Sequence, residues 1–346
     1  MRFSASGFLT RLLFLFCLLT GTGCSKTLLI GPYFTNPLLG SGPDPWVIYK
    51  DVFYYFTKTS GNKITVFQTE KMSTLGKAQE KLIWTPPLAG PYSHDIWAPE
   101  IHYLNNKWYV YFAADSSNDL THRIYVLESS DPTPYTTNWT FKGQLTPTTD
   151  RWAIDPTIMS YKNKLYCIWS GWKANLELGQ QQLYIAKMKD PFTIDSDRVM
   201  ISKPTYTWEK SGSPINEGPE ILQNSSQDVF LIYSANSCNV DDYCLGMLSL
   251  RRNGDPLNPA DWTKSSAPVF SKNTSGNTYG TRHCTFFKSV DGKDDWIIYH
   301  ANSLSGLGCR NSRNPRMQKF SWNSDGTPNF GRPVAAGKQI LNPSGE

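Results

Sequence analysis

Residues 44–56 read Asp-Pro-Trp-Val-Ile-Tyr-Lys-Asp-Val-Phe-Tyr-Tyr-Phe, and this stretch decides the fold. It begins with a polar residue beside proline and runs into an apolar segment that ends at Lys50. The chain then turns at Asp51 and returns through the aromatic residues 53–56. Short runs of aromatic and β-branched residues, bounded by turn-forming residues, are typical of β-strands. The stretch therefore predicts two strands joined by a tight turn.

The same unit occurs five times along the chain. The returning strand of each copy is rich in aromatic and β-branched residues, and the five copies lie at 52–56, 108–112, 165–169, 229–233 and 296–299. A polar residue opens each copy, and these opening residues are Asp44, Glu100, Asp155, Glu217 and His283. Successive opening residues are 55 to 66 positions apart, which is long enough for four strands and their loops.

This repeat predicts an all-β fold, a five-bladed β-propeller. The composition agrees, because 14% aromatic residues, 25 Gly and 23 Pro favour strands and turns, and only 18% of the residues are charged. The first strand of every blade lines the central channel of a propeller, so the five opening residues are expected to converge on one small volume. A β-sandwich with regular strand spacing is the alternative architecture.

The first 23 residues predict a secretory signal peptide. Arg2 and Arg11 lie before an apolar run at 12–19, and the small residues 21–23 follow the run. The apolar run is too short to span a bilayer, so we expect a secreted, extracellular protein without a membrane segment. Residues 24–346 then form a single catalytic propeller. A lipoprotein anchor at Cys24 is the competing interpretation, although the position three residues before it is Gly21.

The net charge indicates which partners to expect, and the cysteine content indicates the redox compartment. The net charge of +5 falls to +3 without Arg2 and Arg11, and no basic run is present, so nucleic acid is excluded as an expected partner. Seven cysteines become six when Cys17 leaves with the signal peptide, an even number that suits an oxidising compartment. Cys238 and Cys244 flank a short polar loop that a local disulfide could close. No cysteine or histidine spacing indicates structural zinc.

Three of the opening residues are carboxylates beside Pro or Gly-Pro: Asp44, Asp155 and Glu217. An Asp before Pro is usually a turn former, but these three occupy one phase of the repeat. Glycoside hydrolysis requires one protonated and one ionised carboxyl group, and a third carboxylate nearby raises the proton affinity of the acid. Cation binding is the other use for such a cluster. Glu220 is a rival acid, but alternating side chains of a strand should point Glu217 and Glu220 to opposite faces.

The mature chain resembles glycoside hydrolase family 43, the five-bladed propeller enzymes that act on arabinan, arabinoxylan and xylan. The resemblance rests on motifs that occur together and in order, at 42–45 (Gly-Pro-Asp-Pro), 94–100 (His-Asp-Ile-Trp-Ala-Pro-Glu), 154–157 (Ile-Asp-Pro-Thr), 170–172 (Ser-Gly-Trp), 216–219 (Asn-Glu-Gly-Pro), 280–284 (Gly-Thr-Arg-His-Cys) and 314–319 (Asn-Pro-Arg-Met-Gln-Lys).

This resemblance implies hydrolysis with inversion of configuration. It makes Asp44 the general base, Glu217 the general acid and Asp155 the residue that tunes and orients the acid. It implies no cofactor for the chemistry. His283 matches an axial histidine that helps to hold a structural cation, usually calcium, although a lone histidine is also a common core residue and calcium prefers oxygen ligands.

Four further residues are expected to bind substrate. Trp97 matches an aromatic platform for the sugar, with a packed core tryptophan as the alternative. Trp172 belongs to the matching Ser-Gly-Trp motif. Arg316 matches an arginine that leans toward the catalytic pocket, with a surface salt bridge as the alternative. Glu100 is expected beside the catalytic groups or in contact with the substrate.

Within the family, we expect an exo-acting α-L-arabinofuranosidase that acts as a monomer on arabinose- or xylose-containing polysaccharides and oligosaccharides. The motifs at 95–101 and 216–220 resemble the exo-acting arabinan branch. The chain ends at Glu346 soon after the fifth copy, without the β-sandwich that many β-xylosidases of the family carry. Endo-1,5-α-L-arabinanase and β-xylosidase are the alternatives within the family. A sugar-binding propeller lectin is the non-enzymatic alternative, and a sialidase is disfavoured because residues 289–296 match its repeated box poorly.

Overall fold

The computed structural model describes Met1, residues 32–175 and residues 180–346. The expected signal peptide at 1–23 and the candidate anchor at Cys24 lie outside the described residues. The chain divides into two units, Met1–Gly31 and Pro32–Glu346, and the second contains every strand discussed below. Within the described residues, no helix has the length and apolar character that crossing a membrane requires.

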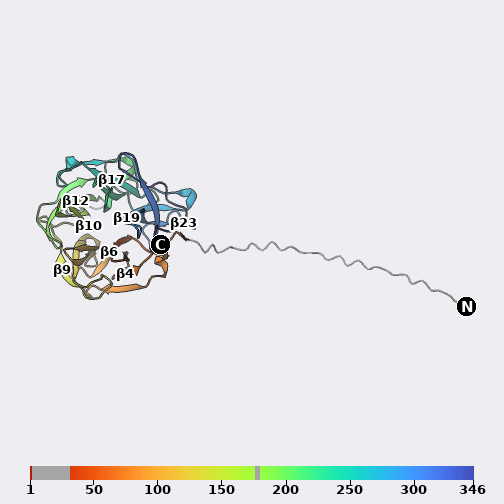
Figure 1. Ribbon diagram of the computed structural model, residues 1–346. Helices are drawn as coiled ribbons and strands as arrows, with labels where there is room; N and C mark the ends of the chain where they lie inside the picture. The colour runs from red at the N-terminus through yellow and green to blue at the C-terminus, as the bar shows by residue number, and fades with distance from the viewer. Residues whose placement is uncertain (2–31, 176–179) are drawn as a thin grey trace. The chain divides into compact units, whose positions relative to one another are not determined.

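Five antiparallel sheets follow one another along the chain, and each is one blade of a propeller (Figure 1). Blades one, two, four and five have four strands, and blade three has five. In chain order the strands of blades one and two are β2 (Trp46–Lys50), β3 (Phe53–Thr57), β4 (Ile64–Thr69), β5 (Glu80–Trp84), β6 (His94–Leu104), β7 (Lys107–Asp115), β8 (Arg123–Ser129) and β9 (Thr140–Gln144).

The strands of blade three are β10 (Ala153–Tyr161), β11 (Lys164–Gly171), β12 (Gln182–Asp190), β13 (Thr193–Ile194) and β14 (Val199–Ser202). Those of blades four and five are β15 (Asn216–Gln223), β16 (Val229–Ala235), β17 (Cys244–Leu250), β18 (Trp262–Lys264), β19 (Tyr279–Lys288), β20 (Asp295–Asn302), β21 (Asn314–Trp322) and β22 (Pro328–Asn329). Between the strands, the described residues form five 3₁₀ helices: η1 (Met72–Lys77), η2 (Asp119–Thr121), η3 (Thr207–Glu209), η4 (Pro259–Asp261) and η5 (Thr274–Gly276).

The first strand of each blade is the innermost one, and these inner strands form a closed ring. β2 contacts β6, β6 contacts β10, β10 contacts β15, β15 contacts β19, and β19 returns to contact β2. In Figure 1 the inner strands β6, β10 and β19 lie near the centre, and β4, β9, β12 and β17 lie further out. The prediction of a five-bladed propeller is confirmed, and the β-sandwich alternative is wrong.

Tight turns join the first two strands of several blades. The two residues between β2 and β3, β6 and β7, and β10 and β11 all have positive φ angles, at Asp51 and Val52, Asn105 and Asn106, and Lys162 and Asn163. Positive φ at both central residues is the geometry of a two-residue type I′ turn, whose twist matches that of the flanking strands. The polar turn after the first apolar segment of the repeat is therefore a hairpin turn.

Hydrophobic cores lie between neighbouring blades. Separate clusters join blades one and two, two and three, three and four, and four and five. A fifth cluster joins blade five to blade one, where Tyr54 and Phe56 pack with Phe287 and Trp296. Both faces of a blade are thus covered, which explains why strands such as β7 are buried at nearly every position and do not alternate.

The ends of the described propeller meet at a small sheet. β1 (Tyr33–Thr35) pairs with β23 (Gln339–Leu341) in an antiparallel arrangement. Phe34 of β1 packs in the core between blades five and one. The pairing therefore holds the two ends of the ring beside the core that closes it.

The expected local disulfide between Cys238 and Cys244 is wrong. Cys238 is bonded to Cys309, which lies 71 residues further along the chain. Cys244 is a buried free thiol in β17, as are Cys167 in β11 and Cys284 in β19. The strand β17 begins at Cys244 and directs its side chain into the core between blades three and four, so this thiol is held away from the loop.

Candidate active site

A left-handed residue stands at the entry of every inner strand. The φ angles are 54° at Asp44, 43° at Ala98, 52° at Asp155, 52° at Gly218 and 43° at His283. A proline follows the first four of these residues. The ladder between the first two strands shifts register at this point in blades two to five. Left-handed backbone at a non-glycine residue costs about 1–3 kcal/mol and persists where the surroundings impose it, often at functional sites.

This geometry corrects the phase of the sequence repeat. The residue equivalent to Asp44 is Ala98 in blade two and Gly218 in blade four, where the sequence pattern indicated Glu100 and Glu217. The X-Pro pair marks the equivalent position in each of these blades, because Ala98-Pro99 and Gly218-Pro219 align with the Asp-Pro pairs that begin at Asp44 and Asp155. Glu217 lies one residue before the left-handed position, and Glu100 lies two residues after it.

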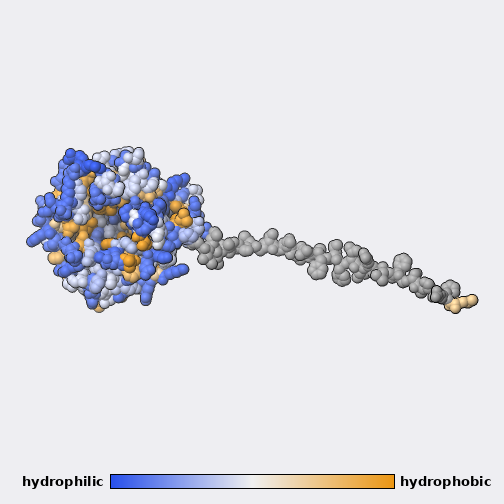
Figure 2. All heavy atoms as spheres, in the orientation of Figure 1, coloured by the Kyte–Doolittle hydropathy of each residue, from blue (hydrophilic) through white to orange (hydrophobic). Residues whose placement is uncertain are grey.

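A cavity of about 610 Å³ opens where these strand entries meet. It is lined by residues of all five blades and the loops between them: Asp44, Thr59, Gly61, Asn62, His94, Asp95, Trp97, Asp119, Trp152, Ile154, Asp155, Gln181, Ile215, Glu217, Cys238, Tyr243, His283, Cys309, Asn311 and Arg313. Figure 2 shows one face of the molecule, where hydrophobic residues gather around a central depression and hydrophilic residues cover most of the rim. All three predicted catalytic carboxylates line the cavity.

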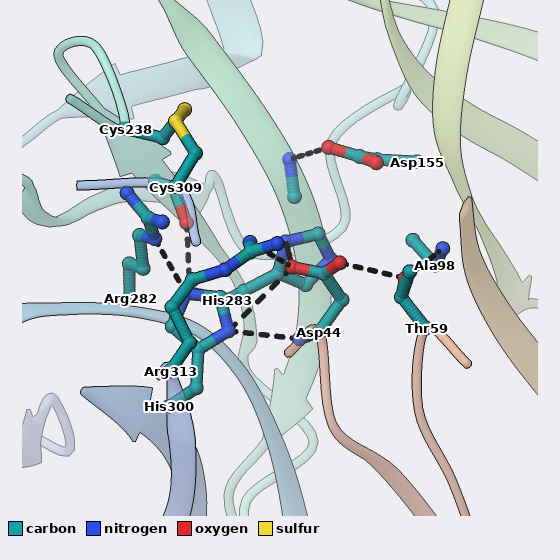
Figure 3. A network of polar contacts seen from close by, with 12 residues as sticks. Asp44, Thr59, Ala98, Asp155, Cys238, Arg282, His283, His300, Cys309 and Arg313 are labelled. Atoms are coloured by element: carbon teal, nitrogen blue, oxygen red, sulfur yellow. Dashed lines mark hydrogen bonds and ion pairs between the residues drawn. A yellow bond between two sulfur atoms is a disulfide. The ribbon is translucent and has the colours of Figure 1, made fainter. Parts of the chain in front are cut away.

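Asp44 is held in its charged form. Its carboxylate accepts a hydrogen bond from Thr59 at 2.7 Å and another from Arg313 at 3.1 Å, and His283 Nδ1 lies 3.3 Å away (Figure 3). Burial alone would raise the pKa of Asp44, but Arg313, His283 and the Thr59 hydrogen bond outweigh burial and lower it. The backbone amide of Asp44 donates to His300 Nδ1 at 2.8 Å. Asp44 is therefore an ionised group in a cavity and is suited to accept a proton.

Glu217 is shifted in the opposite direction. Burial raises its pKa to about 7, the negative charge of Asp44 adds to this effect, and Arg282 and Arg313 oppose it. The hydroxyl of Tyr243 donates a hydrogen bond to Glu217 Oε1. The Tyr243 side chain is 1% exposed and its ring lies under the Arg282 guanidinium, 3.9 Å from the ring centroid. Glu217 therefore keeps a proton close to neutral pH, as a general acid must.

Asp155 connects the acid to blade three. Its Oδ2 atom accepts a hydrogen bond from the backbone amide of Gly218 at 3.0 Å, directly after Glu217 (Figure 3). Burial raises the pKa of Asp155 to about 7, and the charges of Glu217 and Asp44 add to this effect while His283 opposes it. The carboxyl group of Asp155 therefore holds the backbone directly after Glu217 in place.

His283 faces the catalytic carboxylates, and a calcium site there is not supported by its neighbours. Its Nδ1 atom lies against Asp44, which also binds Arg313. In the part of the chain that the structure describes, His283 belongs to no group of three or more acidic, cysteine or histidine ligands that could share an ion. Two cations beside Asp44, Arg282 and Arg313, compete with a metal ion for the same charge. The donor set therefore fits a polar network better than calcium.

Two tryptophans form an aromatic part of the cavity wall. Trp97 lines the cavity, and so does Trp152, which belongs to none of the motifs that predicted the site. Trp172 lies behind Trp152, stacked on it with ring centroids 4.7 Å apart, and does not line the cavity. Trp172 therefore packs against the cavity wall from outside the cavity, and Trp152 is the member of this stacked pair that lines it.

Glu100 does not line the cavity, so the structure does not support a substrate contact. The side chain is 7% exposed and lies 2.9 Å from His102 Nε2. Burial raises the pKa of Glu100 well above its ordinary value, and the neighbouring Glu220 adds to this effect. Burial likewise raises the pKa of Glu220. The rival acid Glu220 is thus part of a second carboxyl pair with Glu100, and of Glu217 and Glu220 only Glu217 lines this cavity.

Arg316 is also placed differently from the prediction. It is fully buried and donates hydrogen bonds to Asn314, Thr278 and Ser303. The arginine that reaches the cavity is Arg313, three residues earlier, at the end of the loop before β21. Arg316 lies within β21, where five consecutive residues are buried in the blade, whereas Arg313 lies in the loop before β21 and binds Asp44. No spacing in the sequence distinguished the two arginines.

Comparison with known proteins shows the family of the chain. The model of the Glycosyl hydrolases family 43 matches residues 34–328. The chain belongs to glycoside hydrolase family 43. The family 43 chain is 42% identical over 312 residues to a Streptomyces avermitilis protein named extracellular exo-α-(1→5)-L-arabinofuranosidase, covering 88% of this chain and 64% of the relative. It is 33% identical to the α-L-arabinofuranosidase 43 of Humicola insolens, covering 91% and 67%.

The family assignment extends to solved structures. The crystal structure of an α-L-arabinofuranosidase from Lactobacillus brevis superposes with a TM-score of 0.83 at 34% identity, covering 88% of this chain and 98% of that one. The chain spans about two thirds of the length of the curated relatives from Streptomyces avermitilis and Humicola insolens.

Proposed function

We propose that this chain is a secreted, inverting α-L-arabinofuranosidase that releases terminal α-L-arabinofuranose from arabinan or arabinoxylan of plant cell walls. The observation that carries the proposal is the opposite shift of two carboxyl groups in one cavity: the pKa of Asp44 is lowered and that of Glu217 is raised to about 7. Two relatives named extracellular exo-α-(1→5)-L-arabinofuranosidase support the sugar, the linkage and secretion.

The proposed reaction is a single displacement. Asp44 takes a proton from a water molecule as the water oxygen forms a bond to the anomeric carbon. Glu217 gives its proton to the glycosidic oxygen as the bond from that oxygen to the anomeric carbon breaks. Water attacks the face opposite the leaving group, so the configuration is inverted. Asp44 then carries the proton and Glu217 the charge, and exchange with solvent restores both.

The other residues of the cavity hold these groups in position. Arg313 and Thr59 bind the Asp44 carboxylate on different sides, which directs its remaining lone pairs. Asp155 holds the Gly218 amide and thereby the backbone beside Glu217. Trp97 and Trp152 offer flat apolar surfaces that suit the apolar face of a sugar ring. Every step of the scheme uses a side chain of this protein.

The product profile tests the proposal. Purified protein is incubated with 1,5-linked arabinan oligosaccharides, arabinoxylan and xylan, and the products are separated by anion-exchange chromatography. We expect arabinose as the first product from arabinan oligosaccharides. Internal oligosaccharides would instead identify an endo-arabinanase, and xylose from xylan a β-xylosidase. Binding of oligosaccharide without any release would favour a lectin and overturn the proposal.

The stereochemistry is tested separately. Proton NMR follows the anomeric signal of the first product during the reaction. We expect the inverted β-anomer of arabinose to accumulate before mutarotation. Early accumulation of the α-anomer would contradict direct attack by water activated at Asp44.

A further inference from the structure

A cluster of three ligating side chains lies beside the aromatic wall of the cavity. Asp115 ends β7, Asp119 begins η2, and His122 follows η2 directly. His122 Nδ1 lies 3.2 Å from Asp119 Oδ1, 3.1 Å from the Asp119 carbonyl oxygen and 3.6 Å from Asp115 Oδ2. Three oxygens from two residues thus surround one imidazole nitrogen. None of these residues has a part in the proposed reaction.

The buried carboxylate of Asp115 is incompletely satisfied. Its Oδ1 atom accepts a hydrogen bond from the Ser117 amide at 2.8 Å. Its Oδ2 atom is buried and has no hydrogen-bond donor, and it points toward His122 Nδ1. Asp115 and His122 are both fully buried. A buried, unpartnered carboxylate oxygen is costly unless a positive group compensates it.

The second nitrogen of His122 also faces an acceptor. His122 Nε2 lies 3.4 Å from the carbonyl oxygen of Asp95, which can only accept a hydrogen bond. A proton on Nε2 satisfies that contact and leaves the Nδ1 lone pair facing three oxygens. A histidine that binds a metal ion typically donates its other ring N–H to such a carbonyl group. The arrangement therefore has both the ligands of a metal site and the outer hydrogen bond that orients the ring.

We propose that Asp115, Asp119 and His122 bind a divalent transition-metal cation. Its four donors are His122 Nδ1, Asp115 Oδ2, Asp119 Oδ1 and the Asp119 carbonyl oxygen. Four ligands at about 2.1 Å from a tetrahedral ion lie roughly 3.4 Å apart, close to the separations seen around Nδ1. The imidazole favours a metal such as zinc over calcium, which takes six to eight oxygen ligands. Without the ion, the lone pairs of these four donor atoms face one another; with the ion bound, the same lone pairs coordinate it.

The cation would support the cavity wall. The ring of Trp97 stacks on His122 with centroids 4.0 Å apart. Trp152 Nε1 donates to the Asp119 carbonyl oxygen at 2.6 Å, and that oxygen retains a second lone pair for the ion. Trp97 and Trp152 both line the cavity. Asp119 itself lines the cavity, so the ion would lie at the edge of this wall. An ion there fixes two aromatic surfaces at once, and its ligands act as positioning residues.

Metal binding by the whole chain tests the proposal. The protein is treated with a chelator, and Zn²⁺ and Ca²⁺ are titrated separately by calorimetry, with metal content measured by mass spectrometry. We expect one equivalent of Zn²⁺ with higher affinity than Ca²⁺. Asp115→Asn and Asp119→Asn preserve side-chain shape, and each should weaken Zn²⁺ binding tenfold or more. Asp150→Asn, which removes an exposed carboxylate paired with Arg123 in the same part of the chain, should bind as the wild type does.

Several outcomes would overturn the site. The first is an absence of Zn²⁺ binding, which would leave a second proton on His122 as the compensating charge. The second is a preference for Ca²⁺ over Zn²⁺. The third is unchanged Zn²⁺ binding in both variants. Asp119 is 69% exposed, so Asp119→Asn keeps the test valid even where Asp115→Asn does not fold. Zn²⁺ should also raise the melting temperature of the wild type and not that of Asp119→Asn.

An activity measurement tests whether the ion positions the aromatic wall of the cavity. This test rests on the proposed function. Removal of the ion should raise KM for arabinan oligosaccharides severalfold and leave kcat nearly unchanged, because the catalytic carboxylates lie elsewhere in the cavity. Metal binding is measured without substrate. Failure of the arabinofuranosidase proposal therefore leaves the binding result standing, and absence of metal binding leaves the reaction scheme standing.

Discussion

The inner strand β15 carries two glutamates in contrasting environments. Glu217 faces the cavity, within the influence of Arg282 and Arg313, and receives a hydrogen bond from Tyr243. Glu220, three residues later, lies near the carboxyl group of Glu100, and burial raises the pKa values of both residues. A smaller cavity of about 350 Å³ is lined by residues of the inner strands β2, β15 and β19, and Glu220 is one of them. One strand thus presents the same residue type to two different cavities.

The contrast shows that burial alone does not make a catalytic acid. Burial raises the pKa of Glu217 and of Glu220, but Glu217 is also influenced by two cations, Arg282 and Arg313, and by the ionised Asp44. Arg282 and Arg313 limit the shift, so the pKa of Glu217 stays at about 7 and its proton can be given up. Glu100 and Glu220 lack this compensation and favour their neutral forms. Acid–base chemistry requires a group that can change its charge.

The largest expected effect separates these two glutamates. Glu217→Gln should lower kcat on arabinan oligosaccharides by about 10²–10⁴-fold, because general acid catalysis contributes about that much. Glu220→Gln is the matched control and should retain activity near that of the wild type, since a neutral amide replaces a carboxyl group already biased toward its neutral form. Steady-state kinetics of both variants decide the assignment. Equal losses in the two variants would contradict the contrast.

The pH dependence of kcat/KM sharpens the comparison. The enzyme requires ionised Asp44 and protonated Glu217, so activity should fall as the pH rises through about 7 and should persist well into the acid range. Arg313 lowers the pKa of both residues, so Arg313→Gln should raise both and move both limbs of the profile to higher pH. We expect about a tenfold loss of kcat/KM, corresponding to about 1.4 kcal/mol. Arg310→Gln, in the same loop, should leave the profile unchanged.

A smaller effect is expected at Tyr243. Tyr243→Phe removes the hydroxyl that donates to Glu217 and keeps the ring under Arg282. A single hydrogen bond contributes about 0.5–1.5 kcal/mol, so kcat should fall roughly two- to tenfold with KM little changed. The measurement is a comparison of kcat and KM at the optimum pH. A change confined to KM would place Tyr243 in substrate binding and not in the support of the acid.

The smallest effect on the chemistry is expected from the disulfide. Cys238 and Cys309 both line the cavity and join the loops that precede Tyr243 and Arg313. A cross-link over 71 residues stabilises a fold by about 4 kcal/mol in the chain-entropy model. Replacing both cysteines by serine should lower the melting temperature and change kcat less than twofold. Reducing agent should destabilise the wild type similarly and should not affect the variant.

Much of the fold follows from local pattern. The residues around 44–56 and their four counterparts specify hairpins, because aromatic and β-branched residues favour strands and polar residues favour tight turns. Repetition of the unit specifies the number of blades. The X-Pro pairs at Asp44, Ala98, Asp155 and Gly218 mark the strand entries even where the opening acidic residues do not.

The sequence by itself therefore determined the propeller and the three carboxylates at its centre. Only the tertiary structure decided which neighbours those carboxylates have. Four features of the site come from loops that follow no period. They are Arg313 instead of Arg316, Trp152 instead of Trp172, the hydroxyl of Tyr243 and the pairing of Cys238 with Cys309. The physical reason is that a strand pattern depends on neighbours along the chain, whereas a pKa or a contact depends on groups brought close through space.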